Sequence, residues 1–273
     1  MTRPTTPSAD LSPETRAELW RTAHALADAA RDVTLRHFRA RGLTADNKEA
    51  EGFDPVTVAD RDCEAAMREI LAQMRPQDAI LGEEQADKPG TSGLTWVLDP
   101  IDGTRGFLSG TPTWGVLIGL ADDQGARLGI VDQPFIGERF CGGFGIARVT
   151  GPTGTHTLGT RAARPLDQSI LFTTFPEIGT PEDRKAFERV SSRARLTRYG
   201  MDCYAYALLA AGQIDLVIEA GLKSYDIMAP LAVIEAAGGI VTDWTGGPAH
   251  RGGRVIAAAN PAIHAEALAL LAE

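Results

Sequence analysis

The sequence predicts an α/β (α+β) protein in which an antiparallel meander is followed by alternating strands and helices. Residues 114–120, 127–131 and 138–142 are apolar or alternating segments between Gly and Asp turns, which is typical of strands joined by hairpins. After residue 154, short apolar runs alternate with segments of helical periodicity, as in βαβ units. With 273 residues, 44% of them hydrophobic, the chain is long enough for one large domain or two closely packed ones.

Two helices are expected before the meander. The first begins at Ser12, whose hydroxyl would cap it, and runs to about Phe38 with apolar side chains at helical spacing. The polar stretch around Lys48, residues 46–52, is predicted to be mobile because it has too few apolar residues to bury. The second helix is expected to begin at Asp60, whose carboxylate would cap it.

A short strand followed by a turn forms the centre of the predicted site. The apolar run from Trp96 to Leu98 indicates a buried strand, and Pro100 cannot donate to a strand ladder, so the chain is expected to leave the sheet at Asp99. Gly103 permits a tight turn, and Thr104 would begin a short helix. Backbone N–H groups at such a turn, with the positive end of a helix dipole, can bind an anion such as phosphate.

Carboxylates lie beside this predicted anion site. Asp99 and Asp102 would repel a phosphate unless hard cations lay between them, and carboxylates with phosphate oxygens suit Mg²⁺. Glu83 ends another predicted strand, residues 79–82, which is a common place for ligand-binding side chains in α/β proteins. These residues predict a metal-assisted phosphate site. The alternative is that Asp99 and Asp102 only cap a turn.

The second half of the chain begins after a loop at residues 150–154. We therefore divide the chain into an N-terminal half, residues 12–150, and a C-terminal half, residues 151–273, which together would form one catalytic unit. One helix of the C-terminal half opens at Tyr225 and Asp226 and ends at a pair of glycines. The other elements expected there are strands at 170–174, 196–199, 214–218, 240–242 and 255–258, and helices at 181–191, 204–211 and 262–271.

Charge and composition narrow the class of protein. A net charge of -9 disfavours general nucleic-acid binding, which usually requires a basic patch. No apolar run approaches the ~20 residues of a membrane-spanning helix. Residues 1–11 are polar and resemble a loose tail and not a signal peptide, and the three cysteines suit reduced thiols. We therefore expect a cytoplasmic protein that acts on a small molecule, with no nucleic-acid or membrane partner.

Three motifs, in order along the chain, resemble the signatures of the inositol monophosphatase family. They are Gly82-Glu83-Glu84, the stretch from Asp99 to Thr104, and Tyr225 to Pro230 followed by Glu235 to Gly239. The resemblance covers about residues 15–270. It implies a layered αβαβα sandwich, of the inositol monophosphatase and fructose-1,6-bisphosphatase type, that is usually a homodimer.

The resemblance also implies a set of Mg²⁺ ligands. Glu83, Asp99 and the carbonyl of Ile101 would hold a first Mg²⁺ ion, while Asp99, Asp102 and Asp226 would hold a second. A third, weaker ion would use Glu83 and water molecules, so two or three ions are expected in each site. Two such cations would stabilise the attacking and leaving oxygens of an in-line displacement at phosphorus.

Catalytic and phosphate-binding roles follow from the same resemblance. Thr104 and Asp60 would orient and deprotonate the attacking water, with Glu83 contributing through its cation. The N–H groups of Gly103 and Thr104 would hold the phosphate. No covalent intermediate with the enzyme is implied.

Within the family, the chain most resembles the histidinol-phosphate phosphatases. The segments that carry this likeness are residues 96–110, 113–119, 200–206 and 222–226. The resemblance implies a Mg²⁺-dependent phosphomonoesterase that hydrolyses L-histidinol phosphate in histidine biosynthesis. Two departures are Gly106, where many relatives have Ser or Asn, and Ser224, where this group often has Pro.

Two acidic residues would favour a substrate that carries a cationic amine. Asp202 and Glu219 suit such an amine better than a neutral polyol, and Arg105 is expected to contact the substrate as well. Asp202 could equally be the N-cap of a helix. The alternative functions are an inositol-1-phosphate phosphatase, a broad-specificity sugar-phosphate phosphatase, or a non-catalytic regulator that binds metal or phosphate.

Overall fold

The computed structural model describes residues 11–47 and 55–273. Most of the predicted tail, and Lys48 with the rest of its polar stretch, lie outside these residues. Asp46 and Asn47, which the composition assigns to that polar stretch, lie in strand β1 (Ala45–Asn47), which pairs with β2 (Pro55–Thr57). Within the described ranges, no helix is long and apolar enough to cross a membrane.

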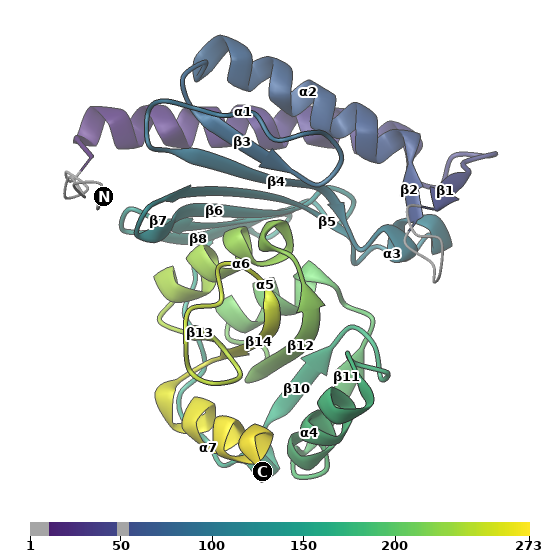
Figure 1. Ribbon diagram of the computed structural model, residues 1–273, viewed down its shortest axis with the longest axis vertical. Helices are drawn as coiled ribbons and strands as arrows, with labels where there is room; N and C mark the ends of the chain where they lie inside the picture. Colours follow the sequence, from purple (N-terminus) through teal and green to yellow (C-terminus); the bar gives the residue numbers. More distant parts are fainter. Residues whose placement is uncertain (1–10, 48–54) are drawn as a thin grey trace, which may run out of the picture.

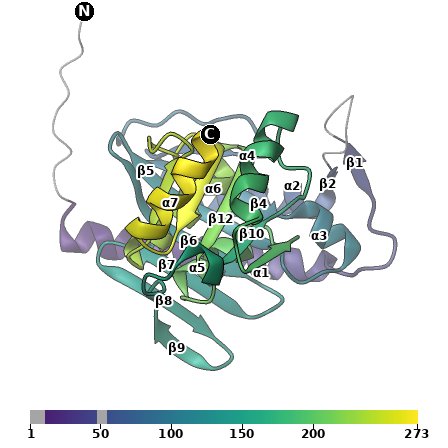
Figure 2. The ribbon, with the colours of Figure 1, turned by 90° about the horizontal axis from the view of Figure 1, so that it is seen from below.

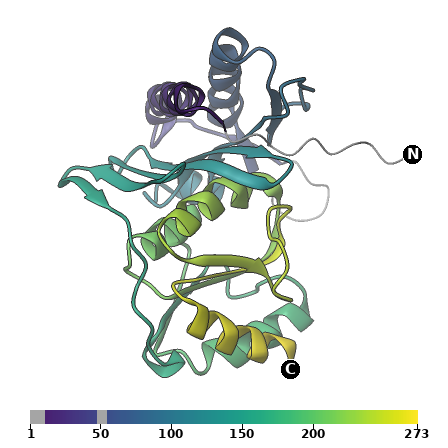
Figure 3. The same cartoon turned by 90° about the vertical axis from the view of Figure 1, so that its left-hand side faces the viewer.

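The elements stack in five layers (Figure 1). Helices α1 (Pro13–His37) and α2 (Val58–Met74) cover the outer face of a seven-stranded sheet. Helices α5 (Cys203–Ala210) and α6 (Ser224–Ala236) lie between this sheet and a second, five-stranded sheet. Helices α4 (Pro181–Ser191) and α7 (Pro261–Ala272) cover the outer face of the second sheet, and Figure 3 shows the same layers from the side. The predicted αβαβα sandwich is confirmed.

The first sheet contains the predicted meander. Its strands, in spatial order, are β3 (Ala79–Gly82), β4 (Thr95–Asp102), β5 (Gly115–Asp122), β6 (Gly125–Gln133), β7 (Glu138–Gly143), β8 (Ile146–Gly151) and β9 (Gly154–Thr157). All neighbours are antiparallel except β3 and β4, which are parallel. The expected boundary loop at residues 150–154 is therefore the turn of hairpin β8–β9, which projects from the body of the molecule (Figure 2).

The second sheet mixes parallel and antiparallel pairs. Its strands, in spatial order, are β11 (Leu196–Tyr199), β10 (Ile170–Thr173), β12 (Leu216–Leu222), β14 (Gly253–Ala258) and β13 (Ile240–Asp243). The short α3 (Thr104–Ser109) follows β4, and a 3₁₀ turn, η1 (Leu166–Gln168), precedes β10. The strands expected in this half are all present, with ends that differ by a few residues.

Helix α6 is apolar on nearly all sides because it is packed between the two sheets. Its residues from Ile227 to Ile234 are all buried. Gly129 and Gly142 on the adjoining strands let the helix approach closely, since a Cβ atom at either position would overlap the α6 backbone. This packing fixes the N-terminal end of α6, which carries Asp226, against the first sheet.

Two predicted boundaries near the site are wrong for physical reasons. Strand β4 does not end at Asp99 but continues to Asp102, because a register shift between these residues accommodates Pro100 where no ladder N–H is required. Helix α2 begins at Val58 and not at Asp60: Thr57 is the N-cap, and Asp60 completes a capping box by accepting a hydrogen bond from the Thr57 N–H at 2.8 Å.

Candidate active site

A cavity of about 450 Å³ lies between the two halves of the molecule. The first sheet contributes residues at the ends of β3 and β4 and the start of α3, and the C-terminal half contributes residues around β12, α5 and α6. The acidic residues that line it are Glu83, Asp99, Asp102, Asp202, Glu219 and Asp226. Most of the predicted site residues therefore meet in one place.

Three of these carboxylates lie close together. Asp99, Asp102 and Asp226 each offer an oxygen atom, and these atoms all lie within 4.8 Å of one another. In a regular strand, Asp99 and Asp102 would point to opposite faces, since side chains alternate. The register shift in β4 changes this alternation, so that both carboxylates reach the same cavity. Asp226 is held at the start of α6, where it accepts a hydrogen bond from the Lys223 N–H at 2.6 Å.

Burial and mutual repulsion disfavour the ionised forms of Asp99 and Asp102. Burial raises the pKa of Asp99 well above its usual value, and the charges of Glu83, Asp102 and Asp226 raise it further. Burial likewise raises the pKa of Asp102, with Asp202 and Asp226 adding to the effect. A hard divalent cation would relieve both penalties, so the donor set fits Mg²⁺.

The turn after β4 brings Gly103 and Thr104 to the cavity. Gly103 has a φ of 84°, a left-handed conformation that favours glycine, and Thr104 is the first residue of α3. The Thr104 hydroxyl donates a hydrogen bond to the Ile101 carbonyl at 3.1 Å. Asp60 is completely buried and accepts a hydrogen bond from the Thr57 hydroxyl at 2.6 Å; it is not among the described residues that line the cavity.

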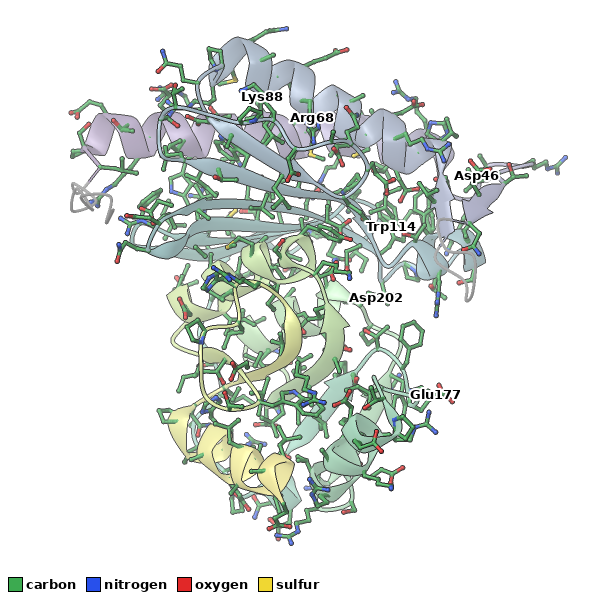
Figure 4. All side chains as sticks on the ribbon, viewed as in Figure 1. Asp46, Arg68, Lys88, Trp114, Glu177 and Asp202 are labelled. Carbon is green, nitrogen blue, oxygen red and sulfur yellow. The ribbon has the colours of Figure 1, made fainter. Side chains whose placement is uncertain are left out.

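Asp202 reaches the cavity from the C-terminal half. It is the N-cap residue of α5, as the alternative predicts, but its side chain makes no capping hydrogen bond to the helix. Its φ of 46° is rare for a residue other than glycine. The carboxylate lies over Gly103, where a Cβ atom would be 2.7 Å from the Asp202 Cγ, and Figure 4 shows Asp202 where the two halves meet. Burial raises the pKa of Asp202 to about 6.

Glu219 is a second buried carboxylate in this cavity. It lies in β12 and is 5% exposed. It accepts hydrogen bonds from the Thr174 N–H at 2.7 Å and from the Thr174 hydroxyl at 2.9 Å. Burial raises the pKa of Glu219 to about 7, although these hydrogen bonds act in the opposite direction.

Several cavity residues were not predicted from the sequence. They are Thr174, Phe175, Tyr206, Lys223 and Tyr225 among others. Thr174 could have been found, because it ends a predicted strand. No sequence pattern pointed to Phe175, because its contact is with a residue distant in the chain. The guanidinium of Arg105 lies 4.8 Å from the centre of the Phe175 ring.

The model of the inositol monophosphatase family matches residues 15–273. The chain belongs to this family. A solved inositol monophosphatase from Zymomonas mobilis has a TM-score of 0.82 and 40% sequence identity, and the match covers 96% of this chain and all of that one.

Two curated relatives of this chain are named as phosphatases. The bifunctional phosphatase IMPL2, chloroplastic, of Arabidopsis thaliana is 45% identical over 225 residues, which are 82% of this chain but only 63% of that protein. The histidinol-phosphatase of Mycobacterium tuberculosis is 33% identical over 253 residues, 91% of this chain and 96% of that protein. The family and its relatives identify the chain as a phosphoric monoester hydrolase.

Proposed function

We propose that this chain hydrolyses L-histidinol phosphate to L-histidinol and phosphate, with Mg²⁺ as cofactor. The observation that carries the choice of substrate is the pair of carboxylates, partly buried Asp202 and buried Glu219, in the cavity next to the acidic cluster. The charge of Arg105 acts against the rise in the pKa of Asp202, whereas the groups that lower the pKa of Glu219 are the neutral groups of Thr173 and Thr174. A cationic amine would add a positive charge beside both carboxylates, whereas a neutral polyol would not.

The proposed Mg²⁺ ligands are the carboxylates of Glu83, Asp99, Asp102 and Asp226, together with the carbonyl of Ile101. Their fit to a divalent cation is supported by the short distances within the cluster and by the raised pKa of Asp99 and Asp102. When bound, Mg²⁺ would lower the pKa of a water molecule and neutralise charge that develops on the phosphoryl oxygens.

The chain's own residues would position the two reactants. The Thr104 hydroxyl donates to the Ile101 carbonyl, so its oxygen can accept a hydrogen bond from the attacking water. The new bond forms between the water oxygen and phosphorus, and the bond from phosphorus to the histidinol oxygen breaks. The water gives up one proton, and the histidinol oxygen takes up one from solvent. For Asp60 to receive the proton of the attacking water through Thr104, the Thr104 hydroxyl would donate to Asp60 in place of the Ile101 carbonyl. In this structure Asp60 accepts hydrogen bonds from Thr57.

The same cavity would bind the histidinol part. Asp202 and Glu219 would accept hydrogen bonds from the amine, with Arg105 and Phe175 at the same cavity. The histidinol-phosphatase of Mycobacterium tuberculosis supports this assignment by its similarity. The second candidate, an inositol-1-phosphate phosphatase, is favoured by the 40% identity to the Zymomonas mobilis structure.

A comparison of substrates tests the proposal. The purified protein with Mg²⁺ is assayed for phosphate release from histidinol phosphate, inositol 1-phosphate, a nucleotide monophosphate and a sugar phosphate. We expect kcat/KM to favour histidinol phosphate by ~100-fold or more, which corresponds to ~2.7 kcal/mol of transition-state discrimination. A flat profile, or one led by inositol phosphate, would refute the substrate and leave the metal chemistry standing.

Two further predictions remain proposals. A homodimer is expected from the family resemblance, and light scattering after size-exclusion chromatography would test it. A cytoplasmic location is also proposed, and fractionation of the source cells would test it, since one plant relative is named as chloroplastic.

A further inference from the structure

Glu64 is a completely buried carboxylate that the proposed mechanism does not use. It lies on α2, and its carboxylate reaches the end of β3. A buried carboxylate is costly unless hydrogen bonds and a cation compensate for lost hydration. Glu64 has both, and its partners lie next to Glu83.

The contacts of Glu64 hold the turn that follows β3. Its Oε2 accepts a hydrogen bond from the Glu84 N–H at 2.7 Å, and its Oε1 accepts one from the Gln85 N–H at 3.1 Å. Arg68, one helical turn further along α2, donates its Nε–H to Oε1 at 2.7 Å and also binds the Gln85 carbonyl at 3.2 Å. The carboxylate thus ties two consecutive backbone N–H groups to a helix of the outer layer.

Gly82 leaves room for this carboxylate. A Cβ atom at Gly82 would overlap the Glu64 carboxylate group. The backbone at Gly82 does not have a positive φ, so its own conformation does not require glycine. The absence of a side chain at the end of β3 is therefore explained by the presence of Glu64.

The backbone of Glu83 is held on both sides as a result. Its own N–H donates to the Leu98 carbonyl of β4 at 3.2 Å, and the next N–H, of Glu84, donates to Glu64. The Glu83 side chain leaves this clamped segment and lines the cavity beside Asp99. Release of the Glu64 contacts would free one side of the segment while leaving the sheet pairing in place.

We propose that Glu64 is a positioning residue that fixes the direction of Glu83 toward the cation it would bind. This inference rests on the proposed role of Glu83 as a Mg²⁺ ligand. Residues that orient metal ligands without touching the metal typically change affinity or activity by about 10–100-fold when mutated. Glu64 would change the affinity for Mg²⁺ because it holds the turn after β3, and it would not contact the substrate.

The test is calorimetric titration of Mg²⁺ into protein stripped with EDTA, without substrate. In Glu64→Gln, the amide NH₂ would face a backbone N–H or Arg68, so at least one of the contacts is lost. We expect about 10–100-fold weaker Mg²⁺ binding. The Mg²⁺ concentration for half-maximal phosphatase activity should rise equally, and excess Mg²⁺ should restore most of kcat.

Asp78 provides a matched control at the other end of the same strand. It is 1% exposed, binds Arg75 at 2.7 Å and accepts a hydrogen bond from the Trp96 indole at 2.9 Å. Asp78→Asn should lower the unfolding temperature as Glu64→Gln does, because each loses a buried ion pair. Its Mg²⁺ affinity should stay within about twofold of wild type, well below the effect expected for Glu64.

The outcomes distinguish the positioning role of Glu64 from the metal-ligand role of Glu83. Wild-type Mg²⁺ affinity in Glu64→Gln, or an equal loss in Asp78→Asn, would overturn the positioning role. If Glu64→Gln does not fold, Gly82→Ala displaces the same carboxylate without removing it, and its Mg²⁺ affinity decides in the same way. If Glu83→Gln itself binds Mg²⁺ normally, then the metal-ligand assignment of Glu83 fails first.

Discussion

The acidic cluster predicts an unusual dependence of stability on pH and Mg²⁺. The pKa of Asp99 and of Asp102 is raised in the folded protein, mainly by burial. Between the unfolded and the folded pKa, the folded state therefore binds more protons than the unfolded state. The free energy of unfolding should fall as pH rises through this interval, by up to about 1.4 kcal/mol per pH unit for each carboxyl group.

Mg²⁺ should reverse this loss, because it binds the ionised cluster in the folded state. At 100 times its dissociation constant, a ligand adds about 2.7 kcal/mol to the free energy of unfolding. Asp99→Asn provides the control variant. Its amide resembles the protonated carboxyl group, which donates a hydrogen bond to Glu83, and it keeps an oxygen for the Ile101 N–H, 3.1 Å away in the wild type.

The assay is urea unfolding across a pH series from about 4 to 8, the range over which raised carboxyl pKa values exert their effect, in EDTA and in Mg²⁺. In EDTA, wild type should lose stability as pH rises, and Asp99→Asn should lose less and be the more stable protein at pH 8. The variant should also lose turnover. Equal pH profiles for wild type in EDTA and in Mg²⁺, or an active Asp99→Asn, would refute the two-cation reasoning.

Three further predictions concern catalysis, specificity and packing. Thr104→Ala should lower kcat by about 10²–10⁴-fold, and Thr104→Ser should keep most of it, because the hydroxyl would orient the water; equal loss in both would contradict this role. Asp202→Asn and Glu219→Gln should each lower kcat/KM for histidinol phosphate by about 10–100-fold, the cost of leaving a buried amine contact unmade, and change hydrolysis of inositol 1-phosphate little. An equal loss on both substrates would argue against amine recognition. Gly129→Ala should cost about 1–3 kcal/mol of stability by urea unfolding, since its Cβ atom would overlap α6, and unchanged stability would refute the close approach.

Local patterns in the sequence determined most of the elements and the identity of the acidic residues. Helix α1 begins where Ser12 and Pro13 predict it, because capping and proline geometry depend only on neighbouring residues. The meander and the later strands follow from short-range alternation, which a strand shows whatever its partner is. The three family motifs are also local stretches, so the family could be assigned before the fold was known.

Only the tertiary structure decided how distant segments combine into the site. The shift in β4 depends on its pairing with β5, and it is this shift that turns Asp99 and Asp102 to one side. The Cys203 N–H donates to the Asp102 carboxylate at 2.6 Å from 101 positions along the chain.

The burial of a side chain and its hydrogen-bond partners depend on residues that are distant in the sequence. The position of Asp202 before a helix does not show that its carboxylate lies over Gly103, and the sequence gives no signal that Glu64 holds the turn after β3. The sequence shows which residues have side chains that can bind a cation. Three-dimensional contacts decide which of them are buried, repelled and held in place.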